Sequence, residues 1–228
     1  MSARDQILGG VRKSLGRIAP LSEEAAAPLK ARLAGHKANL IPERTKGLDA
    51  DGLVGLFSQL MQNCDATVDR VANNEAVPQA VTSYLARYNL PAEAVMSPDP
   101  VLDSIPWSSQ PLLRLRRDRA QGTDAVSITP AFAAIAESGT LVMTSGAERP
   151  TTLNLLPSTH IVVLRKDQVV AASEQAWAKL RETAEARGEA MPRSVNFISG
   201  PSRTGDIESV LQIGSHGPMR LHIVVVDN

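Results

Sequence analysis

The chain has 228 residues, and 43% of them are hydrophobic, so it is long enough to build one sizeable core. Its formal net charge is zero and only 3% of its residues are aromatic. It therefore offers neither a basic surface for phosphate backbones nor aromatic platforms for stacked bases, and we expect no nucleic-acid partner.

Cysteine content and hydropathy limit the cofactors and the location. The single cysteine, Cys64, excludes an internal disulfide and cannot by itself hold an iron–sulfur cluster, which needs about four thiolate or imidazole ligands. We therefore expect this chain to bind no cofactor of its own. No apolar run approaches the roughly 20 residues of a membrane span, and the N-terminus lacks the apolar core of a signal peptide. These features predict a cytoplasmic protein without a membrane span.

Residues 1–47 are predicted to form an N-terminal helix and a linker. A helix over about residues 2–15 is indicated by a Ser2 cap and by apolar residues at helical spacing, namely Ile7, Leu8, Val11 and Leu15. Residues 18–47 contain several prolines and little periodicity, which favours a linker with room for one short helix. The apolar stripe of the first helix could dock on its own domain, on a second copy or on a partner.

Residues 48–228 alternate apolar runs with helical patterns and are predicted to form one α/β domain. Helical patterns cover residues 53–61, 131–136 and 174–187, and Asn74 is expected to cap a further helix. Strands are expected over residues 66–71, 94–96, 112–115, 125–128, 141–143, 161–164, 195–198 and 221–226. Several runs are continuously apolar, so we expect a three-layer α/β/α fold with a mostly parallel sheet. Ligands of such sheets bind beyond the carboxyl ends of the strands.

The segment over residues 199–206 has the composition of an anion-binding loop. It follows an apolar run and is expected to precede a helix capped by Thr204 or Asp206. Glycine permits a close backbone approach, and a helix N-terminus offers free N–H groups. The candidate anion-binding residues here are Ser199, Gly200, Ser202, Arg203 and Thr204. The alternative is an ordinary turn, in which Arg203 pairs with Glu208.

A second polar loop, residues 214–218, contains the histidine best suited to acid–base work. His216 lies between glycines, and its intrinsic pKa lies near neutrality, so we take it as a candidate catalytic residue and its neighbour Gly217 as a binding residue. An exposed turn histidine without a role is the alternative. His160 and His222 fall at or within apolar strands and are interpreted as structural. Since no histidines have metal-ligand spacing, no metal site is predicted.

These loops, together with the segments over residues 136–143 and 155–163, resemble the LUD-domain family, and within it the lactate utilization protein C group. The resemblance implies a fold similar to the NagB/RpiA/CoA-transferase-like group. It also implies a non-redox role in oxidising L-lactate to pyruvate beside two iron–sulfur partner proteins. The expected ligand is a small anion: lactate, pyruvate, or a phosphorylated or CoA compound. The chain departs from the family pattern at Ser138, where Thr is commoner, and at Pro130, where a small or acidic residue is usual. Of the two, Pro130 affects the expected loop geometry.

Glu137 begins a Glu-Ser-Gly segment that resembles the nucleophile motif of CoA transferases of the similar fold. A carboxylate can form an acyl anhydride and then a glutamyl thioester, so Glu137 is a candidate catalytic residue, and Gly139, Thr140 and Asn154 are candidates for orienting a ligand beside it. Alternatively, Glu137 accepts hydrogen bonds from nearby N–H groups or acts as a general base, and Asn154 caps a turn. An acyl or CoA transferase and a ligand-binding scaffold therefore remain alternative functions.

Overall fold

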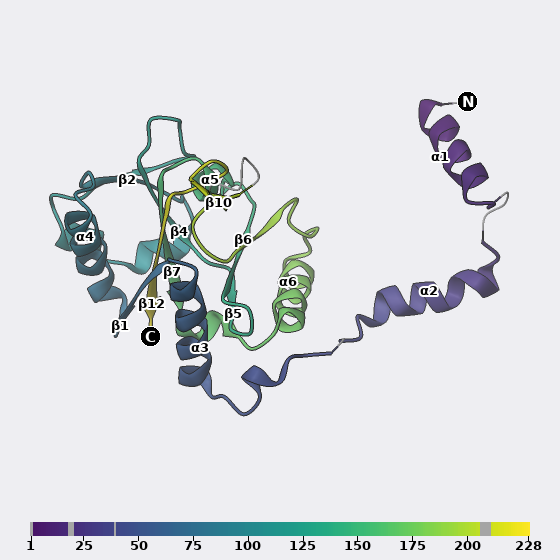
Figure 1. The fold of residues 1–228 in the computed structure, drawn as a ribbon, viewed down its shortest axis with the longest axis horizontal. Helices are drawn as coiled ribbons and strands as arrows, with labels where there is room; N and C mark the ends of the chain where they lie inside the picture. Colours follow the sequence, from purple (N-terminus) through teal and green to yellow (C-terminus); the bar gives the residue numbers. More distant parts are fainter. Residues whose placement is uncertain (1, 18–20, 39, 206–210) are drawn as a thin grey trace. The chain divides into compact units, whose positions relative to one another are not determined.

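The computed structural model describes residues 2–17, 21–38, 40–205 and 211–228, and the chain separates into two compact units, Met1–Leu40 and Ile41–Asn228 (Figure 1).

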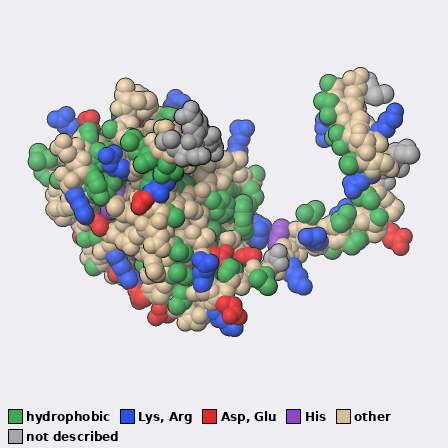
Figure 2. Space-filling view, viewed as in Figure 1, with side chains coloured by type: hydrophobic (Ala, Val, Ile, Leu, Met, Phe, Trp, Pro, Cys, Tyr) green, Lys and Arg blue, Asp and Glu red, His purple; other side chains and the backbone are tan. Residues whose placement is uncertain are grey.

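The N-terminal unit contains two helices, α1 (Ala3–Ser14) and α2 (Glu23–Gly35). As predicted, Ser2 caps α1: its hydroxyl accepts a hydrogen bond from the Asp5 N–H at 3.2 Å, and the Asp5 carboxylate accepts one from the Ser2 N–H at 3.0 Å. Helix α2 has 13 residues and runs through Pro28, so it is longer than the short helix we expected. Neither helix buries a residue, and apolar side chains gather along one side of α1 (Figure 2).

The second unit is built on a six-stranded sheet in which every neighbouring pair is parallel. In spatial order its strands are β1 (Thr67–Val71), β12 (Arg220–Val226), β7 (Thr159–Arg165), β4 (Val126–Pro130), β2 (Glu93–Met96) and β3 (Arg114–Arg117). The central strands β12, β7 and β4 are buried on both faces, which explains their continuous apolar runs. The predicted α/β class with a mostly parallel sheet is confirmed.

A second sheet of four strands lies beside the first. Its order is β8 (Val169–Val170), β5 (Ala133–Ile135), β6 (Thr140–Thr144) and β9 (Val195–Ile198), with β6 antiparallel to both neighbours. The helix predicted over residues 131–136 was wrong, because this stretch contains β5. Ala134 faces the main core, whereas Ala133 and Ile135 face α6, so the segment alternates as a strand does. A short ribbon, β10 (Arg203–Thr204) and β11 (Gln212–Ile213), follows β9.

Helices cover both sheets (Figure 1). Helix α4 (Val77–Arg87) packs on one face of the six-stranded sheet, and α3 (Ala50–Asn63) and the second sheet pack on the other. Helix α6 (Ser173–Arg187) covers the outer face of the second sheet, and the short α5 (Thr152–Leu155) precedes β7. The 3-10 turns are Glu43–Thr45, Asn74–Ala76, Pro100–Ser104, Trp107–Ser109 and Lys166–Gln168. The cap expected at Asn74 is instead made by Asn73, whose side chain accepts a hydrogen bond from the Ala76 N–H at 3.3 Å.

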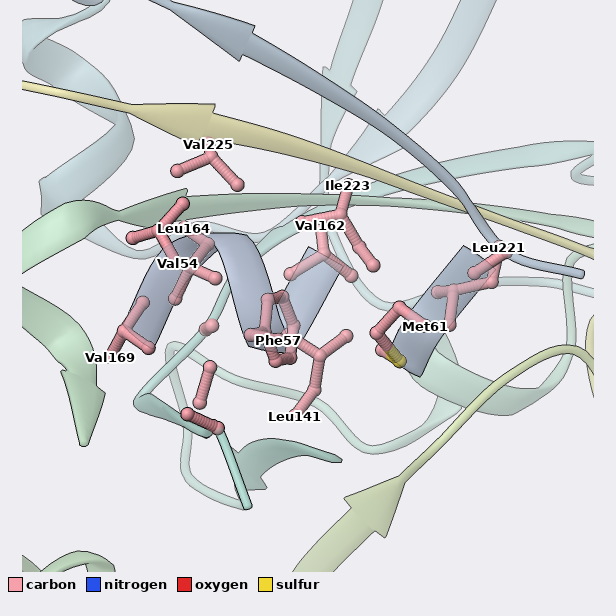
Figure 3. Packing of buried hydrophobic residues seen from close by; sticks show 14 of the residues in the cluster. Val54, Phe57, Met61, Leu141, Val162, Leu164, Val169, Leu221, Ile223 and Val225 are labelled. Carbon is pink, nitrogen blue, oxygen red and sulfur yellow. The ribbon is translucent and has the colours of Figure 1, made fainter. Parts of the chain in front are cut away.

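The core fixes which face each strand residue occupies. In Figure 3, Phe57 of α3 lies among apolar side chains of both sheets, including Val162 and Leu141. Along β7, Val162 and Leu164 face α3, whereas Ile161 and Val163 face α4. By the same alternation His160 lies on the face of α3 and the second sheet, and His222 of β12 lies on the opposite face, against α4.

Candidate functional site

A cleft of about 290 Å³ opens where the polar loops meet the edges of the two sheets. It lies at the amino ends of β7 and β12 and the carboxyl end of β9. Seven of the residues predicted from sequence line it: Asn154, Ser199, Gly200, Ser202, Arg203, His216 and Gly217. The other lining residues are Leu155, His160, Phe197, Ile198, Pro201, Pro218 and Leu221. We expected a site at the carboxyl ends of the parallel strands, whereas this cleft lies at their amino ends, because β9 of the second sheet brings its loop there.

The two loops that form the cleft are hydrogen-bonded into one unit at Ser202. The Ser202 N–H donates to the Pro218 carbonyl at 2.8 Å, and the Gly214 N–H donates to the Ser202 carbonyl at 2.9 Å. The Ser202 hydroxyl accepts a hydrogen bond from the His216 N–H at 3.1 Å. Consequently Ser202 holds the position of the second loop, and the His216 ring extends from an exposed segment.

The C-terminal end of α3 supports the first loop. Gly200 has φ +149°, and a Cβ atom there would lie 2.9 Å from the Cys64 carbonyl oxygen. Arg203 forms an ion pair with Asp65. The helix expected after this loop does not begin at Thr204, which lies in β10, and none of the described residues after it is helical. The other expected cap, Asp206, and the alternative partner of Arg203, Glu208, fall outside the described residues. Among the described residues that line the cleft, Arg203 carries the one permanent positive charge.

Glu137 does not line the cleft. Its Oε1 accepts hydrogen bonds from the backbone N–H and the hydroxyl of Ser173, both at 2.9 Å, at the N-terminus of α6. Its Oε2 is buried and accepts no hydrogen bond from any other described residue. One oxygen thus caps a helix, an arrangement close to the structural alternative considered above.

Gly139 and Thr140 connect the Glu137 turn to the cleft without lining it. The Thr140 hydroxyl lies 2.8 Å from that of Ser138 and 2.7 Å from that of Ser199. Gly139 has φ +59° and packs directly on Leu60 of α3. The Thr140 hydroxyl thus holds Ser199, a residue of the cleft lining.

His160 lines the cleft, although its place in an apolar strand had suggested a purely structural role. The ring is fully buried, its Nε2 lies 2.7 Å from the Thr129 hydroxyl, and its Nδ1 has no partner in the part of the chain that the structure describes. Burial lowers the pKa of His160 to about 3, so the imidazole is neutral near pH 7. Its side-chain direction depends on the pairing of β7 with β4, and this long-range pairing is not visible in the local sequence.

Within the described ranges, no group of three or more His, Cys, Asp or Glu side chains is arranged to hold a metal ion. Among the same residues, none of the helices combines the length and the apolar character needed to cross a bilayer.

Fold and cleft together define an α/β protein with polar loops around a cleft between a parallel sheet and a smaller mixed sheet. The model of the LUD domain matches residues 54–226, and the chain belongs to this family. The fold is similar to that in a crystal structure of a DUF162 family protein from Deinococcus radiodurans, with a TM-score of 0.59 and 22% sequence identity. The match covers 78% of the present chain and 99% of the Deinococcus chain. This similarity concerns the fold.

Curated relatives include proteins named lactate utilization protein C. The protein of Geobacillus thermodenitrificans is 38% identical over 122 residues, which are 53% of this chain and 49% of that protein. The one from Geobacillus sp. (strain WCH70) is 42% identical over 101 residues, or 44% of this chain and 42% of that protein. The match thus spans about half the length of these relatives or less. YkgG of Escherichia coli is 29% identical over the whole of both chains.

Proposed function

We propose that this protein acts in lactate utilization, as a non-redox subunit of a system that oxidises L-lactate to pyruvate. The observation that carries the proposal is the similarity to proteins named lactate utilization protein C, at 38% and 42% identity. Membership of the LUD-domain family agrees with it.

The electrons of lactate oxidation then pass to centres outside this chain. Its one cysteine, Cys64, is an exposed residue that follows α3, and a cluster needs about four ligands. We therefore assign the redox centres to two iron–sulfur partner proteins. The contribution of this chain is to bind a small anion and to dock with those partners in the cytoplasm.

The anion is proposed to bind in the cleft beside Arg203. A guanidinium group pairs well with carboxylate or phosphate, and Arg203 is about one-third exposed, so a ligand can reach it. Lactate, pyruvate and a phosphorylated or CoA compound all present such a group. The apolar part of the lining, including Leu155 and Phe197, leaves room for a short carbon chain.

Calorimetric titration of Arg203→Ala against L-lactate and pyruvate tests this binding mode. Removing a charge-assisted contact should weaken binding by about 1.5 to 3 kcal/mol, roughly ten- to 150-fold. Asp65→Ala is the matched control: it removes the competing carboxylate, so affinity should stay the same or rise. Equal affinities of wild type and Arg203→Ala for every anion, or no binding by either, would contradict an anion site at this position.

A transferase with Glu137 as nucleophile is the alternative function. The hydrogen bonds from Ser173 count against it, because a nucleophilic carboxylate needs a free oxygen that a substrate can reach, and Glu137 does not line the cleft.

A further inference from the structure

Two buried polar side chains of the cleft lining, His160 and Asn154, which we call its floor, have hydrogen-bonding groups that no other described residue uses. His160 is 0% exposed, and its Nδ1 has no hydrogen-bond partner among the described residues. Asn154 is 5% exposed, and its side-chain amide forms no hydrogen bond with the other described residues. A buried polar group without a partner costs about 1 to 3 kcal/mol. The His160 Nδ1 is such a group in the cleft lining, and a ligand that bonds it would recover this cost, with the Asn154 amide of the same lining free to take part.

The second buried histidine of the six-stranded sheet, His222, provides a comparison. His222 lies on the opposite face, where its ring stacks on Tyr84 at 4.0 Å and its Nδ1 lies 2.9 Å from the Thr67 hydroxyl. Its Nε2 lies 3.7 Å from the Asp69 carboxylate, beyond hydrogen-bond distance, and is likewise buried without a partner among the described residues. Within the described residues, each histidine thus leaves one nitrogen unbonded. That of His222 lies near a protein carboxylate, whereas that of His160 belongs to a residue that lines a cleft.

The chemistry of these two side chains selects an uncharged oxygen. With Nε2 at the Thr129 hydroxyl, the neutral His160 ring presents Nδ1 as a donor in one tautomer and as an acceptor in the other. The Asn154 amide can likewise donate or accept. A hydroxyl or keto oxygen fits such groups, whereas an anionic group is better placed at Arg203 of the same cleft.

We propose that His160 and Asn154 bind the 2-oxygen of a short 2-hydroxy or 2-oxo acid, whose carboxylate lies at Arg203. This inference rests on the proposed function, because lactate and pyruvate are acids of this class. It assigns ligand selection to the floor of the cleft, away from the exposed His216. Leu155, Phe197 and Leu221 supply the apolar surface for the short carbon chain.

Calorimetric titration with L-lactate, pyruvate and propionate tests the proposal, because propionate has the same carboxylate and carbon count but no 2-oxygen. Wild type should bind lactate or pyruvate at least about tenfold more tightly than propionate. His160→Gln and Asn154→Leu should lose this preference and keep propionate binding. His222→Gln, a buried histidine changed on the other face of the same sheet, should retain it.

The outcomes separate the two proposals. Equal binding of lactate, pyruvate and propionate by wild type, or a preference kept by both His160→Gln and Asn154→Leu, would overturn the role of the floor and leave the anion site standing. No binding of any of the three acids would overturn both proposals.

Nitrogen NMR of the histidine rings in the wild-type protein decides the question even if a floor variant fails to fold. Lactate should shift the ring nitrogens of His160 and leave those of His222 in place. Saturating lactate without a shift at His160 would overturn the proposal.

Discussion

At the scale of single residues, Glu137 is conspicuous in the sequence, and in the structure it caps helix α6. Helix α6 begins after Ala172, which has no side-chain oxygen, and Glu137 supplies the missing acceptor from another part of the chain. The sequence marks Glu137 because a carboxylate before Ser-Gly and a strand is unusual, but the capping partner Ser173 lies 36 residues away and cannot be inferred locally.

The paired variants Glu137→Gln and Glu137→Ala distinguish a cap from a nucleophile. Gln retains an Oε1 acceptor and loses only the charge at the helix N-terminus, so we expect the free energy of unfolding to fall by at most about 1 kcal/mol. Ala removes both hydrogen bonds and should cost about 1 to 3 kcal/mol. Urea unfolding measures both. Growth on lactate should survive Glu137→Gln, and a variant that folds like wild type yet supports no growth would favour the nucleophile.

The cleft residues show what the sequence can and cannot predict at this scale. Ser199, Gly200, Arg203, His216 and Gly217 were recognisable because glycine and proline beside polar groups mark loops after or before strands. The place of His160 in the cleft lining was not predictable. Its neighbours in the chain are apolar, and only the pairing of β7 with β4 and the packing of the second sheet place it there.

At the scale of elements, the C-terminal end of α3 organises the loops around the cleft. Gly139 packs on Leu60, Gly200 packs on Cys64, and Arg203 pairs with Asp65, so one end of one helix positions both the Glu137 turn and the cleft loop. This explains why glycine occupies two places where the chain approaches a helix closely.

Gly139→Ala should therefore be strongly destabilising. The added Cβ would lie 2.5 Å from the Leu60 Cβ, and φ +59° is unfavourable for alanine, so we expect a loss of about 2 kcal/mol or more in the free energy of unfolding. Gly146→Ala is the matched control, because a Cβ there meets nothing within 4 Å and should change stability by less than about 0.5 kcal/mol. Chemical denaturation of the two variants checks this, and equal stabilities would refute the close packing.

Helices and strands were predicted correctly where the local residue pattern determines them. They were predicted wrongly where long-range packing determines them. The main parallel strands are buried on both faces, so their runs are continuously apolar and recognisable. Residues 133–135 are small and equally apolar, so their pattern does not separate helix from strand, and only the contacts of Ala134 with one core and of Ile135 with another show the alternation. The division of strands between two sheets likewise depends on long-range pairing.

At the scale of the whole molecule, the two buried histidines make stability depend on pH. Burial lowers the pKa of His222 to about 4 and that of His160 to about 3, against 6.5 for the ordinary side chain. Below pH 6.5 the unfolded chain therefore binds more protons than the folded one. The stabilisation is complete above that pH and is lost as pH falls toward the folded values.

We expect each histidine to lower the free energy of unfolding by about 1.4 kcal/mol per pH unit between pH 6 and 4.5. His222→Gln should remove one of these contributions and give a shallower pH dependence than wild type. Urea unfolding at several pH values measures the slopes. Parallel slopes for wild type and His222→Gln would show that His222 does not titrate as its burial implies.

The charge pattern of the whole molecule agrees with a small-molecule role. Positive and negative side chains are interspersed over the face seen in Figure 2, in keeping with the formal net charge of zero. A formal net charge of zero gives no strong long-range attraction for polyanions, which agrees with the proposed recognition of a small anion by local groups of the cleft.

Growth of the organism that encodes this protein tests the central claim most directly. Deleting the gene should abolish growth on L-lactate and leave growth on pyruvate unchanged, because the proposed step lies between the two compounds. Reintroducing the wild-type gene should restore growth on L-lactate, and Arg203→Ala should restore it poorly. Undiminished growth of the deletion strain on L-lactate as sole carbon source would contradict the assignment to lactate utilization.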